Sequence, residues 1–204
     1  MIDLTPLRLP RPHRADAARN YDAILEAARE TFAEQGADVA LEEIARRAGV
    51  GIATLYRNFP TREQLIENVY IAEVEAVCRT AEESADLDPW EGLSVWLHRF
   101  VEYIGAKRPL AAGLNRESAT YDACRQALYQ AGGPLLDRAQ ASGQVRPDVT
   151  IDDVMRLASG IAGVDFATAA QREHVLSVAL DGLGVLPVPS GHGSGSPNSS
   201  LGSN

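Results

Sequence analysis

Residues 49–61 read GVGIATLYRNFPT, and this stretch decides how the amino end of the chain folds. It follows LEEIARRA at residues 41–48, whose apolar residues recur at the spacing of a short helix. A glycine such as Gly49 enters the left-handed turn between two helices without the cost of about 1 kcal/mol or more that other residues bear. We therefore expect a second short helix to begin near Gly51, which makes residues 41–60 a candidate helix-turn-helix.

The two sides of this unit carry different kinds of residue. Ala45 is small enough to let the second helix approach, and Val50 and Leu55 supply inward apolar side chains. The outward side chains are small or hydrogen-bonding, as a helix that enters a DNA major groove requires. They belong to Ile52, Ala53, Thr54, Tyr56 and Arg57. The alternative is a plain αα-hairpin in which the unit only packs.

The remaining sequence also has helical spacing. Residues 15–36 repeat apolar side chains at helical intervals and end on Gly36. Further helices are expected at about 61–84, 89–106, 109–119, 121–142, 151–169 and 171–183, with a break inside 121–142 at Gly132-Gly133-Pro134 and capping residues at Thr61, Asp88 and Thr150. No segment alternates as a strand does. The predicted fold class is all-α, with an N-terminal three-helix helix-turn-helix head and a larger helical domain.

Composition argues against several classes of protein. The chain has 204 residues, 45% of them hydrophobic, and a net charge of −9, which disfavours a generic nucleic-acid coat. It has no run of 18 apolar residues and no apolar signal segment at its start, so neither a membrane span nor secretion is expected. Cys78 and Cys124 lie far apart in helical patterns and are interpreted as free thiols, which favours the cytoplasm.

The sequence lacks a catalytic or metal-binding constellation. His13 and His192 lie in the predicted tails, while His98 and His174 stand alone on predicted helices. HExxH, CxxC and the nucleophile elbow are missing, and GVG at 49–51 follows a helix where a dinucleotide site needs a strand. We expect no enzyme activity, no cofactor and no metal.

The segment TLYRNFPTREQL resembles the signature of the tetracycline-repressor (TetR) family of bacterial transcription regulators. The IARRAGV turn and the first helix, ILEAARETFAEQG, extend the resemblance over about residues 18–70. The whole chain is most similar to the subset with an SbtR-like C-terminal domain. The resemblance implies four parts, listed in order: a flexible basic arm at 1–15, a helix-turn-helix DNA-binding domain at 16–66, a ligand-binding and dimerisation domain at 67–186, and a disordered tail at 187–204.

The resemblance also implies roles for individual residues at the DNA. Tyr56 meets the phosphate backbone and a thymine methyl group, and Thr54 also points to DNA. Arg62 occupies a basic position that grips phosphate. Thr61 caps the same helix, so the helix N–H groups aim at that phosphate.

Base reading is expected to be largely apolar. Gly51, Ile52 and Ala53 occupy the base-facing positions and offer no side-chain hydrogen bond, so they would contact thymine methyl groups. Arg57 is the best candidate for a polar contact, and Asn58 can hydrogen-bond a phosphate. Specificity then rests partly on DNA shape and on the arm. The arm either follows phosphates or a minor groove, or is a solvated tail; its basic residues are Arg8, Arg11, His13, Arg14 and Arg19.

Two further sites are expected in the C-terminal part. Small residues in LASGIAG and the apolar face of helix 171–183 suggest a four-helix bundle between two subunits, with packing inside one subunit as the alternative. The expected interface comprises Ala158, Gly160, Ala162, Gly163, Val175, Leu176 and Ala179. Aromatic residues dominate ligand cavities, so the expected pocket comprises Trp96, Phe100, Tyr103, Tyr121, Cys124 and Phe166, each of which can instead be plain core. His98, Arg99 and Arg116 are read as polar contacts of that pocket or as exposed salt bridges.

These observations predict a homodimeric repressor that an unknown small-molecule effector releases from a palindromic operator in double-stranded DNA. Two alternatives remain open. One is a helical small-molecule sensor that acts through a protein partner, and the other is an activator with the same fold.

Overall fold

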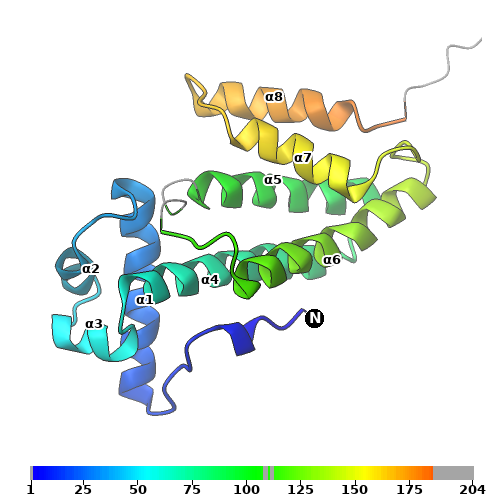
Figure 1. Cartoon of the computed structure of the whole chain (residues 1–204). Coiled ribbons are helices and arrows are strands. Elements are labelled where there is room, and N and C mark those ends of the chain that lie inside the picture. The colour runs from blue at the N-terminus through cyan, green and yellow to red at the C-terminus, as the bar shows by residue number, and fades with distance from the viewer. Residues whose placement is uncertain (1, 108–109, 111–112, 186–204) are drawn as a thin grey trace, which may run out of the picture.

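The computed structural model describes residues 2–107, 110 and 113–185, and Figure 1 shows their arrangement. The predicted all-α fold is confirmed, because the described residues form no named strand. The elements are η1 Thr5–Leu7, α1 Ala15–Gln35, α2 Leu41–Arg47, α3 Ile52–Asn58, α4 Arg62–Glu83, α5 Pro89–Lys107, α6 Ala119–Ala141, α7 Ile151–Ala162 and α8 Ala169–Asp181.

Two clusters of buried apolar residues divide the chain, and α4 belongs to both. Val69 of α4 packs in the cluster with α1, α2 and α3, whereas the next residue, Tyr70, packs in the cluster with α5, α6, α7 and α8. We call the part up to Val69 the head and the part from Tyr70 the body. Figure 1 shows α4 running from the head into the body, with α7 and α8 far from α1–α3.

The turn between α2 and α3 has the predicted geometry. Gly49 has φ +67°, the left-handed region that only glycine enters freely. The N–H of Val50 donates to the carbonyl oxygen of Ala45 at 3.0 Å, and Ala45 is buried. Ile44 and Leu55 are fully buried, one from each helix. These contacts fix α3 against α2.

The amino-terminal residues, expected to form a flexible arm, pack against the protein instead. Leu4 is buried in the body cluster, and the Leu9 N–H donates to Asn68 Oδ1 of α4 at 2.9 Å. The hydroxyl of Tyr21 donates to the Leu9 carbonyl oxygen at 3.1 Å. Leucines within a Pro- and Arg-rich sequence supply the apolar anchors that a composition argument overlooked. The predicted tail at 187–204 lies outside the described residues.

Three helix predictions in the body need correction. The helix expected at 109–119 is absent from the described residues 113–118, because Ser118 caps α6 by accepting from the Tyr121 N–H at 3.1 Å. The helix expected at 151–169 ends at Ala162, since Thr168 caps the start of α8. The predicted caps at Thr61, Asp88 and Thr150 are confirmed by hydrogen bonds to the first turns of α4, α5 and α7.

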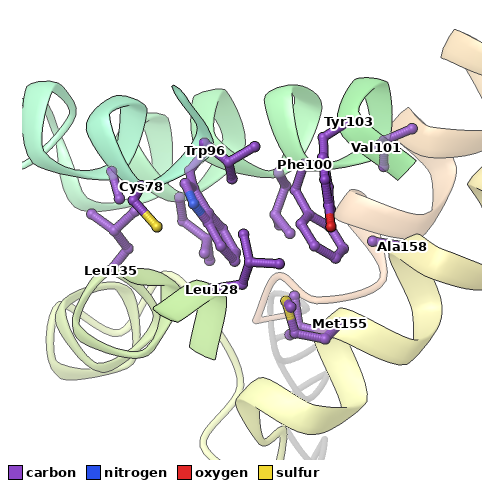
Figure 2. Packing of buried hydrophobic residues seen from close by; sticks show 14 of the residues in the cluster. Cys78, Trp96, Phe100, Val101, Tyr103, Leu128, Leu135, Met155 and Ala158 are labelled. Atoms are coloured by element: carbon purple, nitrogen blue, oxygen red, sulfur yellow. The ribbon is translucent and has the colours of Figure 1, made fainter. Parts of the chain in front are cut away.

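The third correction concerns α6, which continues through Gly132-Gly133-Pro134. Pro134 cannot donate a backbone hydrogen bond and normally kinks or ends a helix. Gly132 offsets this by close packing, because a Cβ added there would lie 2.2 Å from an indole carbon of Trp96. Figure 2 shows Trp96, Phe100 and Tyr103 pointing from α5 into the core that α6 and α7 line.

Candidate DNA-binding face, cavity and subunit interface

Neighbouring residues of α3 face opposite ways. Leu55 is fully buried in the head, whereas Tyr56 is 46% exposed and is one of the few large apolar side chains at the surface. Gly51, Ala53 and Arg57 are also exposed. The segment from Gly49 to Asn58 contains no carboxylate. The outward face of α3 can therefore approach a polyanion without a like charge of its own.

The polar side chains of α3 are held by the helix itself. Arg57 Nη2 donates to Thr54 Oγ1 at 3.2 Å, and Asn58 Nδ2 donates to the Thr54 carbonyl oxygen at 2.8 Å. Ile52 and Thr54 are half-buried. Arg57 keeps its other nitrogens available at the exposed end, so it remains the polar residue best placed for a DNA contact.

Arg62 has a structural partner that the sequence did not suggest. Its Nη1 donates to the carbonyl oxygens of Ala37 at 2.8 Å and Val39 at 2.6 Å. These bonds tie the start of α4 to the loop between α1 and α2. Thr61 Oγ1 accepts from the Gln64 N–H at 3.2 Å, as a cap does. A phosphate contact at this helix start stays a prediction.

Arginines next to α3 are paired within the head. Glu43 accepts from Arg46 at 2.8 Å and from Arg47 at 2.9 Å, and Arg47 also pairs with Glu34 at 2.8 Å. Hydrogen bonds from Arg46, then from Arg47, lower the pKa of the Glu43 carboxyl to about 2. The bonds to Glu43 hold both guanidinium groups at the surface of α2.

Most of the basic residues of the amino-terminal segment are also paired. Arg8 bonds Glu75 at 2.8 Å, Arg11 bonds Asp22 through two nitrogens, and Arg19 bonds Asp16. His13 and Arg14 are exposed. The structure therefore leaves His13 and Arg14 as the residues of this segment best placed to meet DNA, and that contact stays a prediction.

A cavity of about 540 Å³ lies among α4, α5, α6 and α7. Three of the predicted pocket residues line it: Phe100, Tyr103 and Tyr121. Trp96 and Cys124 are instead fully buried core residues, and Phe166 lines a separate cavity of about 310 Å³. The other residues that line the large cavity are Tyr70, Ile104, Arg125, Leu128, Tyr129, Met155, Arg156, Ser159 and Gly160.

Three of these lining residues share a spacing that is visible in the sequence. Tyr121, Arg125 and Tyr129 are four residues apart along α6, so they share one helical face. Tyr70 carried no such signal, because it stands in a run of buried residues of α4. Of the polar candidates, His98 Nε2 lies 2.9 Å from Glu173, and Arg99 donates to Glu73 at 2.8 Å. Neither lines the cavity.

The residues of α7 and α8 that were predicted at a subunit interface differ in burial. Ala158, Ala162 and Leu176, which were predicted at a subunit interface, are buried inside the single chain. They pack α7 against neighbouring helices, since α7 contacts both α5 and α8. Gly160, Gly163 and Val175 are exposed, and Ala179 is half-buried.

A stripe of larger apolar side chains on α7 and α8 is exposed. Val175 and Val178 belong to the apolar face that was expected on helix 171–183, whereas Leu157 and Val164 were not predicted. Leu157 lies on α7, and Val164 follows directly after the C-cap of that helix, Gly163. Val175 and Val178 lie three residues apart on one face of α8. These four are among the seven large hydrophobic side chains exposed in the described chain. We call them the apolar stripe.

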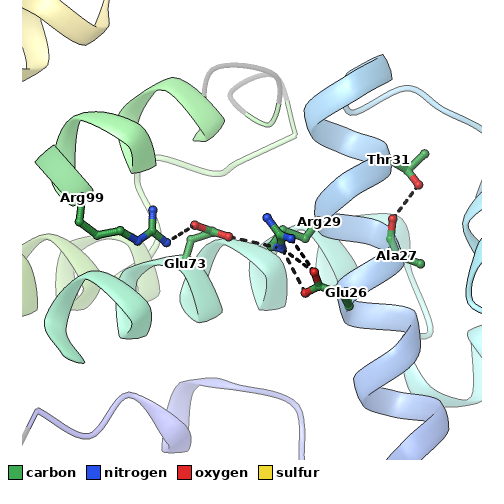
Figure 3. A network of polar contacts seen from close by, with 6 residues as sticks. All are labelled: Glu26, Ala27, Arg29, Thr31, Glu73 and Arg99. Atoms are coloured by element: carbon green, nitrogen blue, oxygen red, sulfur yellow. Dashed lines mark hydrogen bonds and ion pairs between the residues drawn. The ribbon is translucent and has the colours of Figure 1, made fainter. Parts of the chain in front are cut away.

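An ion network joins the head to the body. Figure 3 shows Glu73 of α4 between Arg29 of α1 and Arg99 of α5. Glu73 is only 9% exposed, and its oxygens lie 2.8 Å from Arg99 Nη2 and 3.9 Å from Arg29 Nε. Arg99 precedes Phe100, which lines the cavity. These three side chains therefore connect α1 and α5 through α4.

Among residues 2–107, 110 and 113–185, none of the helices combines the length and the apolar character that a membrane span needs. Within the same residues, no three His, Cys, Asp or Glu side chains are grouped to hold a metal ion.

Known proteins match both parts of the chain. Residues 24–69 match bacterial regulatory proteins of the tetR family, and residues 88–185 match the C-terminal domain of SbtR-like transcriptional regulators. A TetR transcriptional regulator of solved structure from Streptomyces coelicolor is 42% identical, with 80% of this chain and 98% of that chain covered and a TM-score of 0.71.

Two more relatives agree with these matches. A TetR transcription regulatory protein of solved structure from Mycobacterium vanbaalenii is 36% identical, with 85% of this chain and 100% of that chain covered and a TM-score of 0.69. An uncharacterized HTH-type transcriptional regulator from Mycobacterium bovis is 28% identical over 170 residues, which are 80% of this chain and 87% of the relative.

Proposed function

This chain belongs to the tetR family of bacterial regulatory proteins, and from that premise we propose that it is a homodimeric repressor released from a palindromic operator by a small-molecule effector. It would act in the cytoplasm on double-stranded DNA, and by binding rather than by catalysis. Two copies of α3 would enter successive major grooves about 34–36 Å apart. The observation that carries the proposal is the outward Tyr56 beside the buried Leu55.

The contacts proposed at the DNA come from α3 and the start of α4. Exposed Tyr56 and Arg57 would meet phosphate or base edges, and Gly51, Ile52 and Ala53 would meet thymine methyl groups. Thr54, Asn58, Thr61 and Arg62 would act mainly by holding the helices at the angle the groove requires, because each already has a bond within the head.

The apolar stripe supports the proposed dimer. Its residues are exposed on α7, directly after α7 and on α8, where a second copy of these helices would bury them. In sedimentation experiments we expect Val178→Glu to yield monomers. Tyr56→Glu is the matched control, because Tyr56 is exposed on α3, and Figure 1 shows α7 and α8 far from α3. Equal dimerisation of both variants would contradict this interface.

A gel-shift experiment on the intergenic DNA upstream of the gene tests the regulator proposal. We expect Arg57→Gln to weaken binding by about tenfold or more, since such contacts contribute about 1–3 kcal/mol. Arg146→Gln is the matched control, an exposed arginine that pairs with Asp148 between α6 and α7. We also expect binding to fall steeply with added salt as counterions are released. Unaltered binding by Arg57→Gln would count against the assigned face.

The alternatives predict different results. A sensor that acts through a protein partner would dimerise normally and retain no genomic fragment at low salt. An activator would bind DNA as the repressor does, but deleting its gene would lower transcription of the neighbouring genes instead of raising it.

The effector must bind the DNA-free form of the protein more tightly than the DNA-binding form. It shifts a 99:1 equilibrium between these forms to 1:99 only if its affinities for the two differ by roughly 10⁴-fold.

A further inference from the structure

We propose that the cavity among α4, α5, α6 and α7 takes a flat aromatic acid, whose ring lies among tyrosines and whose single anionic group meets Arg125 at the mouth. This rests on the proposed function, because the cavity is where an effector would bind. Its volume of about 540 Å³ falls within the range of about 300–1,000 Å³ of small-molecule sites.

The aromatic character of the walls selects the ring. Five of the twelve lining residues are aromatic. The rings of Tyr70 and Tyr121 are stacked with their centroids 5.7 Å apart and an angle of 9° between their planes. Tyr103 follows at 6.3 Å from Tyr70, and Phe100 at 5.9 Å from Tyr103. Aromatic groups favour such offset and tilted arrangements, so a flat ring can join this series.

The charge of the lining selects the anion. The lining contains Arg125 and Arg156 and no aspartate or glutamate, although the whole chain carries −9. Asp152, just outside the lining, accepts from Arg156 Nε at 2.5 Å and from the Tyr129 hydroxyl at 2.7 Å. One carboxylate thus neutralises one of the two cations at the mouth.

Arg125 is the cation that remains. Its guanidinium carbon lies 5.9 Å from the centre of the Tyr129 ring, and no described carboxylate lies within 4.0 Å of its nitrogens. A guanidinium on an aromatic face keeps its planar donors for a ligand carboxylate, which it can bind through two parallel hydrogen bonds. Arg125 is exposed, so it stands at the mouth, while Phe100 and Tyr103 lie at the buried end.

The buried phenols do not oppose an anion. Burial raises the pKa of Tyr70 and the pKa of Tyr103 above the ordinary value, so both hydroxyls stay protonated at neutral pH. The deep end is therefore uncharged and aromatic, and the mouth is cationic. A molecule with a flat ring at one end and a carboxylate at the other matches that order.

Binding of two probes that differ only in charge tests the anion. We choose 2-naphthoate and 2-naphthamide, and measure both by calorimetry on the purified full chain at neutral pH without DNA. We expect the acid to bind at least about tenfold more tightly, because a charge-assisted bidentate pair is much stronger than a neutral hydrogen bond. Equal affinities, or binding of neither probe, would overturn the proposal.

Variants place the anion at the cavity mouth. Arg125→Gln should lower the affinity for 2-naphthoate about tenfold, to that of the amide, and leave 2-naphthamide unaffected. Arg146→Gln, the exposed control arginine, should change neither. The assignment would be contradicted if Arg146→Gln bound the two probes equally, or if Arg125→Gln still bound 2-naphthoate more tightly than 2-naphthamide. Unfolding temperatures of both variants verify that they fold.

A saturated acid tests the ring. Decahydro-2-naphthoate has the same charge and a similar size, but no flat aromatic face, so it should bind at least about tenfold more weakly than 2-naphthoate. An equal affinity would refute the aromatic half of the proposal. All these measurements omit DNA, so failure here leaves the gel-shift result intact, and a failed gel shift leaves these affinities intact.

Discussion

In the head, Leu55 and Tyr56 are consecutive residues, yet the first is fully buried and the second is 46% exposed. In the body, Phe100 is buried in the core and also lines the cavity. In the head, one residue packs in the core and the next is available to bind a ligand. In the body, the single side chain of Phe100 packs in the core and also lines the cavity.

The cause of this difference is the shape of each site. A helix that enters a groove presents one face to the ligand and keeps the opposite face for packing. A cavity is enclosed by the same side chains that fill the core around it. Substitutions on the outward face of α3 should therefore change binding without changing stability, whereas substitutions of buried residues that line the cavity should change both.

The largest effect should come from Phe100→Ala. Truncating a buried phenylalanine costs about 3–5 kcal/mol of unfolding free energy, and the same change removes a wall of the cavity. We expect urea unfolding to show that loss and calorimetry to show weaker binding of 2-naphthoate. Tyr56→Ala is the contrasting variant: its unfolding free energy should stay within about 0.5 kcal/mol, while DNA affinity falls. If Phe100→Ala is as stable as the parent, Phe100 does not serve the core and the cavity together.

Two adjacent glycines of α6 give a matched pair. A Cβ at Gly132 would lie 2.2 Å from Trp96, whereas nothing lies within 4 Å of a Cβ added at Gly133. Gly132→Ala should lower the unfolding free energy by about 1–3 kcal/mol through overpacking. Gly133→Ala should raise it by up to about 1 kcal/mol, because alanine is the better helix former. Thermal unfolding of both measures the difference, and the same sign for both would contradict the packing described for Trp96.

The head was predictable from sequence because its features are local. Gly49, Ala45 and Leu55 lie within eleven residues, and each has a role that follows from backbone geometry or size. The outcome confirms the turn at Gly49. Arg62 is the exception: its partners, Ala37 and Val39, are carbonyl groups more than twenty residues away, which no spacing rule reveals.

The body was less predictable because its sites are made by distant elements. The cavity draws Tyr70 from α4 and Met155 from α7, and nothing in the sequence states that these helices meet. The same limit applies to the predicted subunit interface. Ala158 and Leu157 are consecutive, and only the packing of α7 decides that alanine turns inward and leucine outward. Small residues in a sequence indicate close packing, without indicating which partner packs.

A smaller effect is expected at the junction of the two parts. Glu73→Gln keeps an acceptor for Arg99 but removes the charge that Arg29 and Arg99 share, so we expect a loss of about 1 kcal/mol in unfolding free energy. Trp90 and Trp96 both lie in the body, so fluorescence reports the body and circular dichroism reports the whole chain. Their unfolding midpoints should coincide in the parent and separate in the variant.

A control variant distinguishes that coupling from a general loss of charge. Glu26→Gln removes the exposed partner of Arg29, which donates to Glu26 from Nε at 3.1 Å. We expect its two midpoints to stay together. If the midpoints of Glu73→Gln also stay together, the head and body are coupled by α4 alone, and the network of Figure 3 contributes only local stability.

The smallest effect should be the pH dependence of the Glu43 pair, at the surface of the head. Its pKa is about 2 in the folded protein, lowered from 4.5 by hydrogen bonds from Arg46 and Arg47. A lowered pKa contributes stability that is complete above pH 4.5 and is lost as the pH falls toward 2. The exposed pair is screened by solvent, so this contribution is slight. Carboxyl resonances in an NMR titration should give the low value directly.

Comparing variants isolates this group from the other carboxylates that titrate in acid. Between pH 5 and about pH 2, Glu43→Gln should lose less unfolding free energy than the parent, because the titrating group is gone. Glu42→Gln, which removes the neighbouring exposed carboxylate, is the control and should follow the parent. A Glu43 that titrates near 4.5 would mean that the pair is broken in solution. Arg46 would then be free to join α3 at the DNA, whereas Arg47 would keep its pairing with Glu34. The recognition surface of the head would extend onto α2.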